Sequence, residues 1–191
     1  MNGRRVVVTG IGALTPVGNN LKDSWSSLIK GVSGAAPITY FDTTNFKTQF
    51  ACEVKGFDPT EVISFKEARK LDKFSQYALV VADEAVKDSK IDINSINTNR
   101  SGVVWGSGIG GMETFFNESV NFGLGNGTPR FNPFFIPKLI SDIPAGHISI
   151  KYNFRGPNFT TVSSCASSTN ALIDAFNYIK WNKADIFLVG G

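Results

Sequence analysis

Alternation of short apolar runs with helical patterns constrains the fold of this 191-residue chain more than any other feature. The runs predict strands at Arg4–Thr9, Ser101–Trp105, Phe159–Val162 and Ile186–Val189, with a further short strand at Phe50–Val54. Helical patterns separate most of these strands, and such alternation is typical of α/β folds with parallel strand pairing. We therefore expect an α/β domain built on a parallel sheet.

The strongest helical pattern runs from Lys66 to Lys87, where apolar residues recur every three or four positions. Further helices are predicted from Leu21 to Ile29, over Met112–Asn121 and over Ala166–Ile179. The segment Ile148–Tyr152 fits helix and strand equally well. Residues 35–63 have no long pattern, and residues 122–144 form a proline-rich loop whose phenylalanines are too apolar to face water, so we expect them to pack against other groups.

The last predicted strand bears on domain organisation. Residues Ile186–Val189 are all apolar, a pattern typical of a strand that is buried on both faces. The sequence then stops at Gly190-Gly191, with no helix to cover that strand. We expect residues 1–191 to be one part of a longer protein.

Composition excludes several classes of function. The 19 Lys+Arg and 16 Asp+Glu leave a net charge of +3, too small for a nucleic-acid-binding face. No apolar run approaches the roughly 20 residues that a membrane span needs. Two cysteines, Cys52 and Cys165, make no disulfide framework, and the single histidine, His147, leaves no His/Cys metal cluster. We expect a cytoplasmic protein with reduced thiols and no metal.

The loop from Gly106 to Gly111 reads G-x-G-x-x-G after a strand, the pattern of a dinucleotide site. That site also needs a second strand within about 30 residues that carries an acid for the ribose. The aromatic loop follows instead, without an acid between Glu118 and Asp142. A close-packed turn is therefore the better interpretation, and we expect no cofactor.

Cys165 is the strongest candidate for chemistry. A strand leads into it and a helix begins directly after it, which places the thiol at the first helical turn. Unpaired N–H groups and the positive end of the helix dipole both favour the thiolate there, which is the reactive form. The alternative is a buried, inert cysteine, and that is the better interpretation of Cys52.

Two further features admit more than one interpretation. His147 could act as a base, although a structural role is the simpler explanation. Lys66, Arg69, Lys70 and Lys73 recur at helical spacing and put four positive charges on one face. That face is either plainly solvated or docks an acidic partner.

Taken together, these segments resemble the N-terminal half of the β-ketoacyl-acyl carrier protein synthases of the type II elongating class, in the thiolase superfamily. The resemblance runs over the whole chain. It is carried by seven motifs in order: Arg5–Gly12, Thr15–Gly18, Arg69–Phe74, Gly106–Gly111, Pro133–Pro137, Gly156–Asn158 and Ser164–Ala166.

The resemblance implies a layered αβαβα thiolase-like fold, of which residues 1–191 would be the N-terminal βαβαβ half with an inserted helical and loop region. It implies a homodimer, which fits the low charged fraction of 18%. Cys165 would be the acyl-accepting nucleophile, and its N–H a donor to the thioester oxygen. A second N–H, two histidines and a lysine would come from the C-terminal half, so residues 1–191 alone should be inactive.

By the same resemblance, Ile109 lines the acyl pocket as a gate and Phe134 reaches the pocket of the partner subunit. Lys66, Arg69 and Lys70 would dock the acyl- and malonyl-loaded acyl carrier protein. The chain departs from many relatives at Ser168 and Asn170, where they carry Gly and His, so the resemblance does not fix the acyl chain length.

The implied reaction is the decarboxylative condensation of an acyl-enzyme thioester with malonyl-acyl carrier protein in fatty acid elongation. Other functions remain open at this stage. One is a thiolase that acts on coenzyme A thioesters. Another is a condensing or chain-length subunit of a type II polyketide or aryl polyene pathway.

Overall fold

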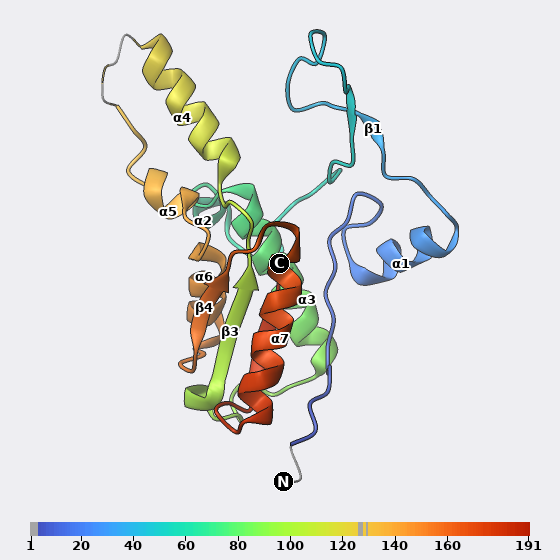
Figure 1. Ribbon diagram of the computed structural model, residues 1–191, viewed down its shortest axis with the longest axis vertical. Coiled ribbons are helices and arrows are strands. Elements are labelled where there is room, and N and C mark those ends of the chain that lie inside the picture. The colour runs from blue at the N-terminus through green and yellow to red at the C-terminus, as the bar shows by residue number, and fades with distance from the viewer. Residues whose placement is uncertain (1–3, 126–127, 129) are drawn as a thin grey trace.

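The computed structural model describes residues 4–125, 128 and 130–191. Its centre is a three-stranded parallel sheet in the order β4-β3-β5, flanked by helices on both faces (Figure 1). The helices are α1 Leu21–Ile29, α2 Phe65–Ala68, α3 Lys73–Ser89, α4 Met112–Leu124, α5 Phe135–Leu139, α6 Ile143–Tyr152 and α7 Ser167–Lys180. The strands are β1 Ala36–Pro37, β2 Phe50–Ala51, β3 Ser101–Gly106, β4 Asn158–Thr161 and β5 Ile186–Gly190, and short 3₁₀ turns span Thr98–Arg100 and Ser164–Ala166.

Strand β3 organises the core because all of its residues are buried. Successive side chains of a strand point to opposite faces, so Val103 and Trp105 face α3 and α6, whereas Val104 packs against α7. Ile148 of α6 is fully buried in the first of these layers. The expected α/β class with parallel pairing is confirmed.

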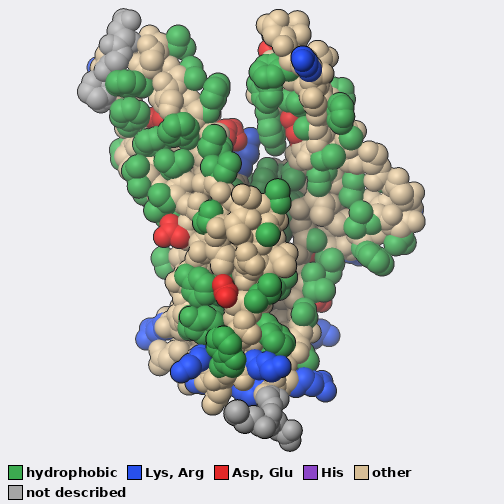
Figure 2. Space-filling model, in the orientation of Figure 1, with side chains coloured by type: hydrophobic (Ala, Val, Ile, Leu, Met, Phe, Trp, Pro, Cys, Tyr) green, Lys and Arg blue, Asp and Glu red, His purple; other side chains and the backbone are tan. Residues whose placement is uncertain are grey.

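Two projections extend from this core (Figure 1). Helices α4 and α5 form one, and the antiparallel pair β1 and β2 forms the other. Figure 2 shows that the surface is hollowed between them and that hydrophobic side chains are frequent on both. Near the start of the first projection, Lys73 of α3 binds Glu113 at 3.1 Å, and its ammonium lies 4.3 Å from the ring centre of Tyr40.

The predicted strand Arg4–Thr9 is wrong: this segment has no strand pairing. Val6–Gly10 and Ile186–Val189 of β5 line one cavity of about 630 Å³, and β5 pairs only with β3 among the described residues. Carboxylates of α3 hold the continuation of the segment instead. Asp88 accepts from the N–H of Ile11 at 3.0 Å, and Glu84 accepts from the N–H of Ala13 at 2.8 Å.

The single helix predicted from Lys66 to Lys87 is also wrong, because the structure divides it into α2 and α3. Asp72 has an extended backbone, with φ −73° and ψ 159°, and its side chain caps α3 by accepting from the N–H of Phe74. Ser64 and Glu67 form a capping box at the start of α2. The apolar period continues across the break, which is why the sequence pattern conceals it.

Smaller predictions had mixed outcomes. Helix α1 is confirmed, although its apolar residues Trp25, Leu28 and Ile29 are exposed. The strand predicted at Phe50–Val54 is confirmed only for its first two residues, and Cys52 just beyond them is exposed rather than buried. The ambiguous segment Ile148–Tyr152 is the C-terminal half of α6.

The aromatic loop predicted at residues 122–144 contains α5 and the start of α6. Its rings pack on one another, with centre separations of 5.3 Å for Phe122 and Phe131 and 5.5 Å for Phe131 and Phe135. Phe115 of α4 stacks on Phe135, so the loop lies along α4. Residues 126, 127 and 129 of this loop, and residues 1–3 of the N-terminus, are outside the described residues.

Candidate active site

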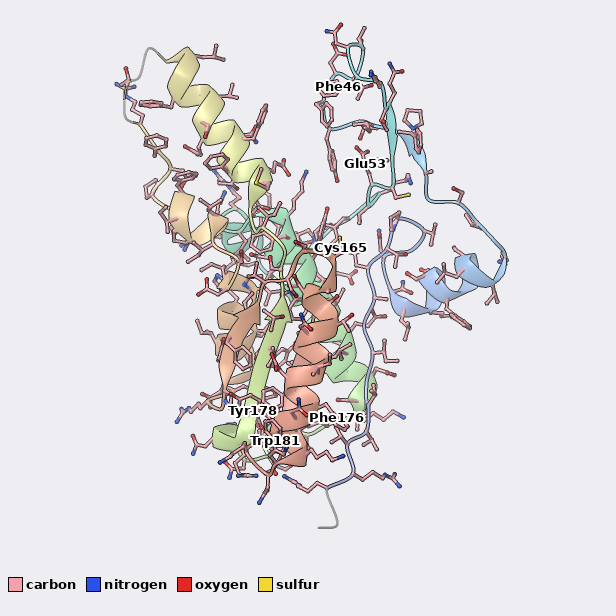
Figure 3. All side chains as sticks on the ribbon, viewed as in Figure 1. Phe46, Glu53, Cys165, Phe176, Tyr178 and Trp181 are labelled. Carbon is pink, nitrogen blue, oxygen red and sulfur yellow. The ribbon has the colours of Figure 1, made fainter. Side chains whose placement is uncertain are left out.

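Cys165 lies where β4 passes into α7, at the end of the helix that faces the base of the two projections (Figure 3). The sequence predicted a helix directly after the cysteine. In the structure, Cys165 is the middle residue of the 3₁₀ turn Ser164–Ala166, and α7 begins two residues further on. The thiol is exposed.

The turn that carries Cys165 is a sharp elbow. Ser164 has φ +51°, a left-handed backbone conformation that residues other than glycine rarely adopt. Ser167, buried at the first position of α7, holds the elbow from below. Its hydroxyl accepts from the N–H of Ser163 at 2.9 Å and donates to the carbonyl of Ser164 at 2.7 Å. Thr161, the last residue of β4, donates its hydroxyl to the carbonyl of Ser167 at 2.8 Å.

Electrostatics at this elbow favour an anion. Helix α7 has 14 residues and no side-chain cap at its start, so its first N–H groups and the positive end of its dipole face the elbow. Among the described residues, none accepts a hydrogen bond from the N–H of Cys165. An oxyanion formed beside the sulfur could therefore take that donor.

The glycine turn Gly106–Gly111 lies directly against the elbow. The N–H of Ser107 donates to the carbonyl of Thr161 at 3.1 Å, and a side chain at Gly106 would collide with the backbone of Ser167 and Ser168. The predicted close-packed turn is thus confirmed, because these glycines permit backbone contact.

Ile109, the predicted gate of the acyl pocket, is carried by the same turn with 67% of its surface exposed. Ser141 fixes its backbone by donating a hydroxyl hydrogen bond to its carbonyl at 2.9 Å. The following residue, Gly110, has φ +101°, so the chain reverses there before α4 begins. The structure therefore brings Ile109 into the loop cluster that contains Cys165.

Asp72, which sequence reasoning did not single out, fixes the other end of this turn. The residue is 7% exposed, and its carboxylate accepts from the N–H of Thr114 at 3.1 Å and from the Thr114 hydroxyl at 2.6 Å. Helix α4 has no side-chain cap of its own, so the carboxylate of Asp72 serves the starts of both α3 and α4. A cap from a distant segment leaves no local signal in the sequence.

Three of the basic residues predicted to dock a partner share one groove of about 870 Å³. Lys66, Arg69 and Lys70 line it, as does Phe134, whose ring centre lies 5.5 Å from the Lys70 ammonium. Arg130 reaches the same groove from the loop after α4, a contribution that helical spacing could not reveal. Lys73 is absent from the groove because it belongs to α3, beyond the break at Asp72.

His147 is half-buried in α6 and lines a different cavity, of about 520 Å³, with Glu67 and Lys151. Burial lowers the pKa of His147 below its ordinary value, and the charge of Glu67 partly opposes this. The structure does not bring His147 to Cys165, which agrees with a structural role.

Within residues 4–125, 128 and 130–191, no group of three His, Cys, Asp or Glu side chains could hold a metal ion. No helix in the same part of the chain is long and apolar enough to cross a membrane.

The fold, a parallel sheet between helix layers, is shared with solved ketosynthase structures. The solved structure of the ishigamide ketosynthase/chain length factor matches 99% of this chain with a TM-score of 0.92 at 25% identity, and the match covers 47% of that chain. The predicted thiolase-like fold is confirmed.

Residues 3–191 match the model of the family described as Beta-ketoacyl synthase, N-terminal domain. The chain belongs to this family. It is 45% identical over 188 residues to 3-oxoacyl-[acyl-carrier-protein] synthase 2 of Staphylococcus aureus (strain COL), covering 98% of this chain and 45% of the relative. The corresponding enzyme of Coxiella burnetii is 42% identical over 191 residues, covering 100% and 46%. The chain thus spans less than half the length of these curated relatives.

Proposed function

We propose that these residues form the N-terminal half of an elongating 3-oxoacyl-acyl carrier protein synthase, an acyltransferase of fatty acid biosynthesis. The observation that carries the proposal is the exposed Cys165 at an elbow where helix N–H groups converge. The sequence identity of 42–45% to enzymes of that name supports the proposal as well.

In the first proposed step, the Cys165 thiolate attacks the thioester carbonyl of acyl-loaded carrier protein. Negative charge develops on the carbonyl oxygen, and a fixed N–H donor such as that of Cys165 stabilises it, an effect worth about 3–4 kcal/mol per donor in other enzymes. The bond to the carrier sulfur then breaks, and that sulfur leaves as a thiolate. The acyl group now forms a thioester with Cys165.

In the second step, malonyl-loaded carrier protein loses carbon dioxide, and the electron pair of the broken C–C bond becomes a carbanion. The carbanion attacks the Cys165 thioester, and the sulfur leaves as thiolate. The product is a 3-oxoacyl-carrier protein two carbons longer. The family resemblance assigns a second oxyanion donor, two histidines and a lysine to the C-terminal half, so residues 1–191 alone are proposed to be inactive.

For the acyl pocket we propose Ile109 as the gate and Phe134 as the residue that reaches the pocket of a second subunit. The contact of the Ile109 turn with the elbow supports the first role. A homodimer is supported by the exposed apolar surface of α4, including Phe116 and Leu124, and by the outer edge of β4, which is unpaired within the described chain. Sedimentation of the full-length protein at increasing concentration tests the dimer.

The acyl carrier protein is the proposed partner of the groove lined by Lys66, Arg69 and Lys70. Carrier proteins are acidic, and three cations converge there with Arg130. Exchanging Lys70 for Glu should raise KM for acyl-carrier protein, most strongly at low salt, and leave alkylation of Cys165 unchanged. Lys22→Glu, on exposed α1, is the matched control and should change neither. An unchanged KM in the Lys70 variant would remove this groove from the proposal.

The decisive test replaces Cys165 by Ala in the full-length protein. Condensation should be lost, and a cerulenin-type epoxide should label wild type at Cys165. Cys52→Ala is the control, because Cys52 is also exposed but directly follows β2, in the projection that β1 and β2 form. Normal turnover in Cys165→Ala would refute the proposal.

We also propose a cytoplasmic location for the protein, since both thiols are exposed and unpaired.

A chain-length subunit that binds without condensing is the second candidate, favoured by the likeness to a ketosynthase/chain length factor. The exposed thiol at a helix start argues against it, because a non-catalytic subunit needs no nucleophile. Assaying the protein without any partner subunit separates the two: independent condensation supports the elongating enzyme.

A further inference from the structure

We propose that Asn170 is a positioning residue for the Cys165 nucleophile, acting through a hydrogen bond to Ser163. This inference rests on the proposed function of Cys165. Asn170 lies in the first turns of α7, and its side-chain amide donates to the hydroxyl of Ser163 at 2.6 Å. Both residues are half-buried, so the bond is shielded from water on part of its surface.

The elbow needs an external support because its backbone is unfavourable. Ser163 has φ −149° and ψ 47°, and Ser164 follows in the left-handed region. A residue other than glycine persists in such a conformation only where the surroundings impose it. If the support is removed, the chain can relax between Ser163 and Ser164, and the sulfur of Cys165 moves with it.

Two side chains of α7 provide this support, from different sides of Ser163. The Ser167 hydroxyl accepts a hydrogen bond from the backbone N–H of Ser163, and the Asn170 amide donates one to the Ser163 hydroxyl. Asn170 is three positions after Ser167, so the two lie on one face of α7. Together they fasten the last residue before the elbow to the helix whose N-terminus faces the thiol.

The sulfur itself has no such support. No hydrogen bond from the Cys165 side chain to any described residue is present, and the thiol is exposed. Its position relative to the helix N-terminus therefore depends on the backbone of Ser163 and Ser164. Asn170 thus influences how strongly the helix stabilises the thiolate, although it does not touch the reacting atoms.

The test compares Asn170→Ala, Ser163→Ala and the double variant in the full-length protein. Each single change removes the same hydrogen bond from a different side. Asn177→Ala is the matched control, because Asn177 is seven positions further along α7 and its side chain makes no hydrogen bond to a described residue. The readout is the rate of iodoacetamide alkylation at Cys165 at neutral pH, with Cys52 as an internal standard, together with kcat and KM in turnover.

We expect alkylation of Cys165 at neutral pH to slow about fivefold in both single variants, the factor that one ordinary neutral hydrogen bond supplies. Cys52 should be alkylated at the wild-type rate in every variant. The double variant should match the single ones, because all three lack one and the same bond. In turnover, kcat should fall with KM for carrier protein unchanged.

Several results would overturn the inference. They are wild-type alkylation in Asn170→Ala, a similar loss in Asn177→Ala, or additive losses in the double variant. If Asn170→Ala does not fold, Ser163→Ala decides alone, since it leaves α7 unaltered. A failed Cys165→Ala test would refute the proposed function without touching these alkylation results, so the two failures can be told apart.

Discussion

Replacing Asp72 by Ala should cost the protein about 3 kcal/mol of unfolding free energy. The loss of the α3 cap contributes about 1 kcal/mol, because the N–H of Phe74 loses its side-chain acceptor. The loss at α4 is larger, since the Asp72 carboxylate accepts from both the N–H and the hydroxyl of Thr114. A hydrogen bond to a charged group contributes about 1.5–3 kcal/mol net of the bonds to water that it replaces. The cost of burying the carboxylate offsets part of the sum.

Urea denaturation of the full-length protein measures this loss, and a double-variant cycle identifies its cause. Thr114→Val alone removes the hydroxyl and should cost about 1 kcal/mol. Combined with Asp72→Ala it should add almost nothing, because the carboxylate that the hydroxyl binds is already gone. Asp72→Asn keeps one oxygen acceptor and should lose about half as much as Asp72→Ala.

Asp58→Ala is the matched control for the aspartate. Asp58 also accepts a backbone N–H two residues ahead, from Thr60 at 2.9 Å, but it is exposed in a loop. Its removal should cost no more than about 0.5 kcal/mol. Equal losses for the Asp58 and Asp72 variants, or additive losses for Asp72 and Thr114, would refute the idea that one carboxylate holds two helix starts.

Three further predictions concern His147 and two glycines. Because burial lowers the pKa of His147, the unfolded chain binds its proton more readily, and unfolding free energy should fall as pH drops below about 6.5. In His147→Gln the difference between pH 7.5 and pH 5.5 should shrink, and an unchanged difference would contradict this assignment. Gly106→Ala should cost about 1–3 kcal/mol and slow alkylation of Cys165, because the new methyl group collides with the start of α7. Gly146→Ala, in α6 where a methyl group meets no atom within 4 Å, should instead raise unfolding free energy by up to about 1 kcal/mol in the same denaturation experiment.

The sequence predicts those parts of the fold whose cause is local. The strand at residues 101–105 is an example, because the run Val103-Val104-Trp105 sends alternate side chains into two different helix layers. The elbow cysteine is predictable for a similar reason, since a β-rich run, a series of small residues and an amphipathic helix follow one another. These signals need no knowledge of distant contacts.

Predictions failed where the cause is distant. The apolar run Arg4–Thr9 has the composition of a strand, but pairing depends on a partner strand elsewhere in the fold, and the described sheet contains only β4, β3 and β5. The break between α2 and α3 depends on Asp72, whose partners include Thr114, 42 positions away. The bond from Asn170 to Ser163 is closer in sequence, but only the three-dimensional elbow turns the two side chains toward each other.

The register of the sheet explains why the glycine turn that carries Ile109 lies beside the elbow that carries Cys165. Strands β3 and β4 are parallel, and Gly106 at the end of β3 pairs with Thr161 at the end of β4. The glycine turn and the cysteine elbow therefore leave the same edge of the sheet at the same level, the edge where open α/β sheets bind ligands. A shift of one residue would turn Trp105 out of the layer of α3 and α6 and toward α7, whose layer the smaller Val104 fills. The cost of that shift fixes the register, so core packing far from the thiol determines which side chains surround it.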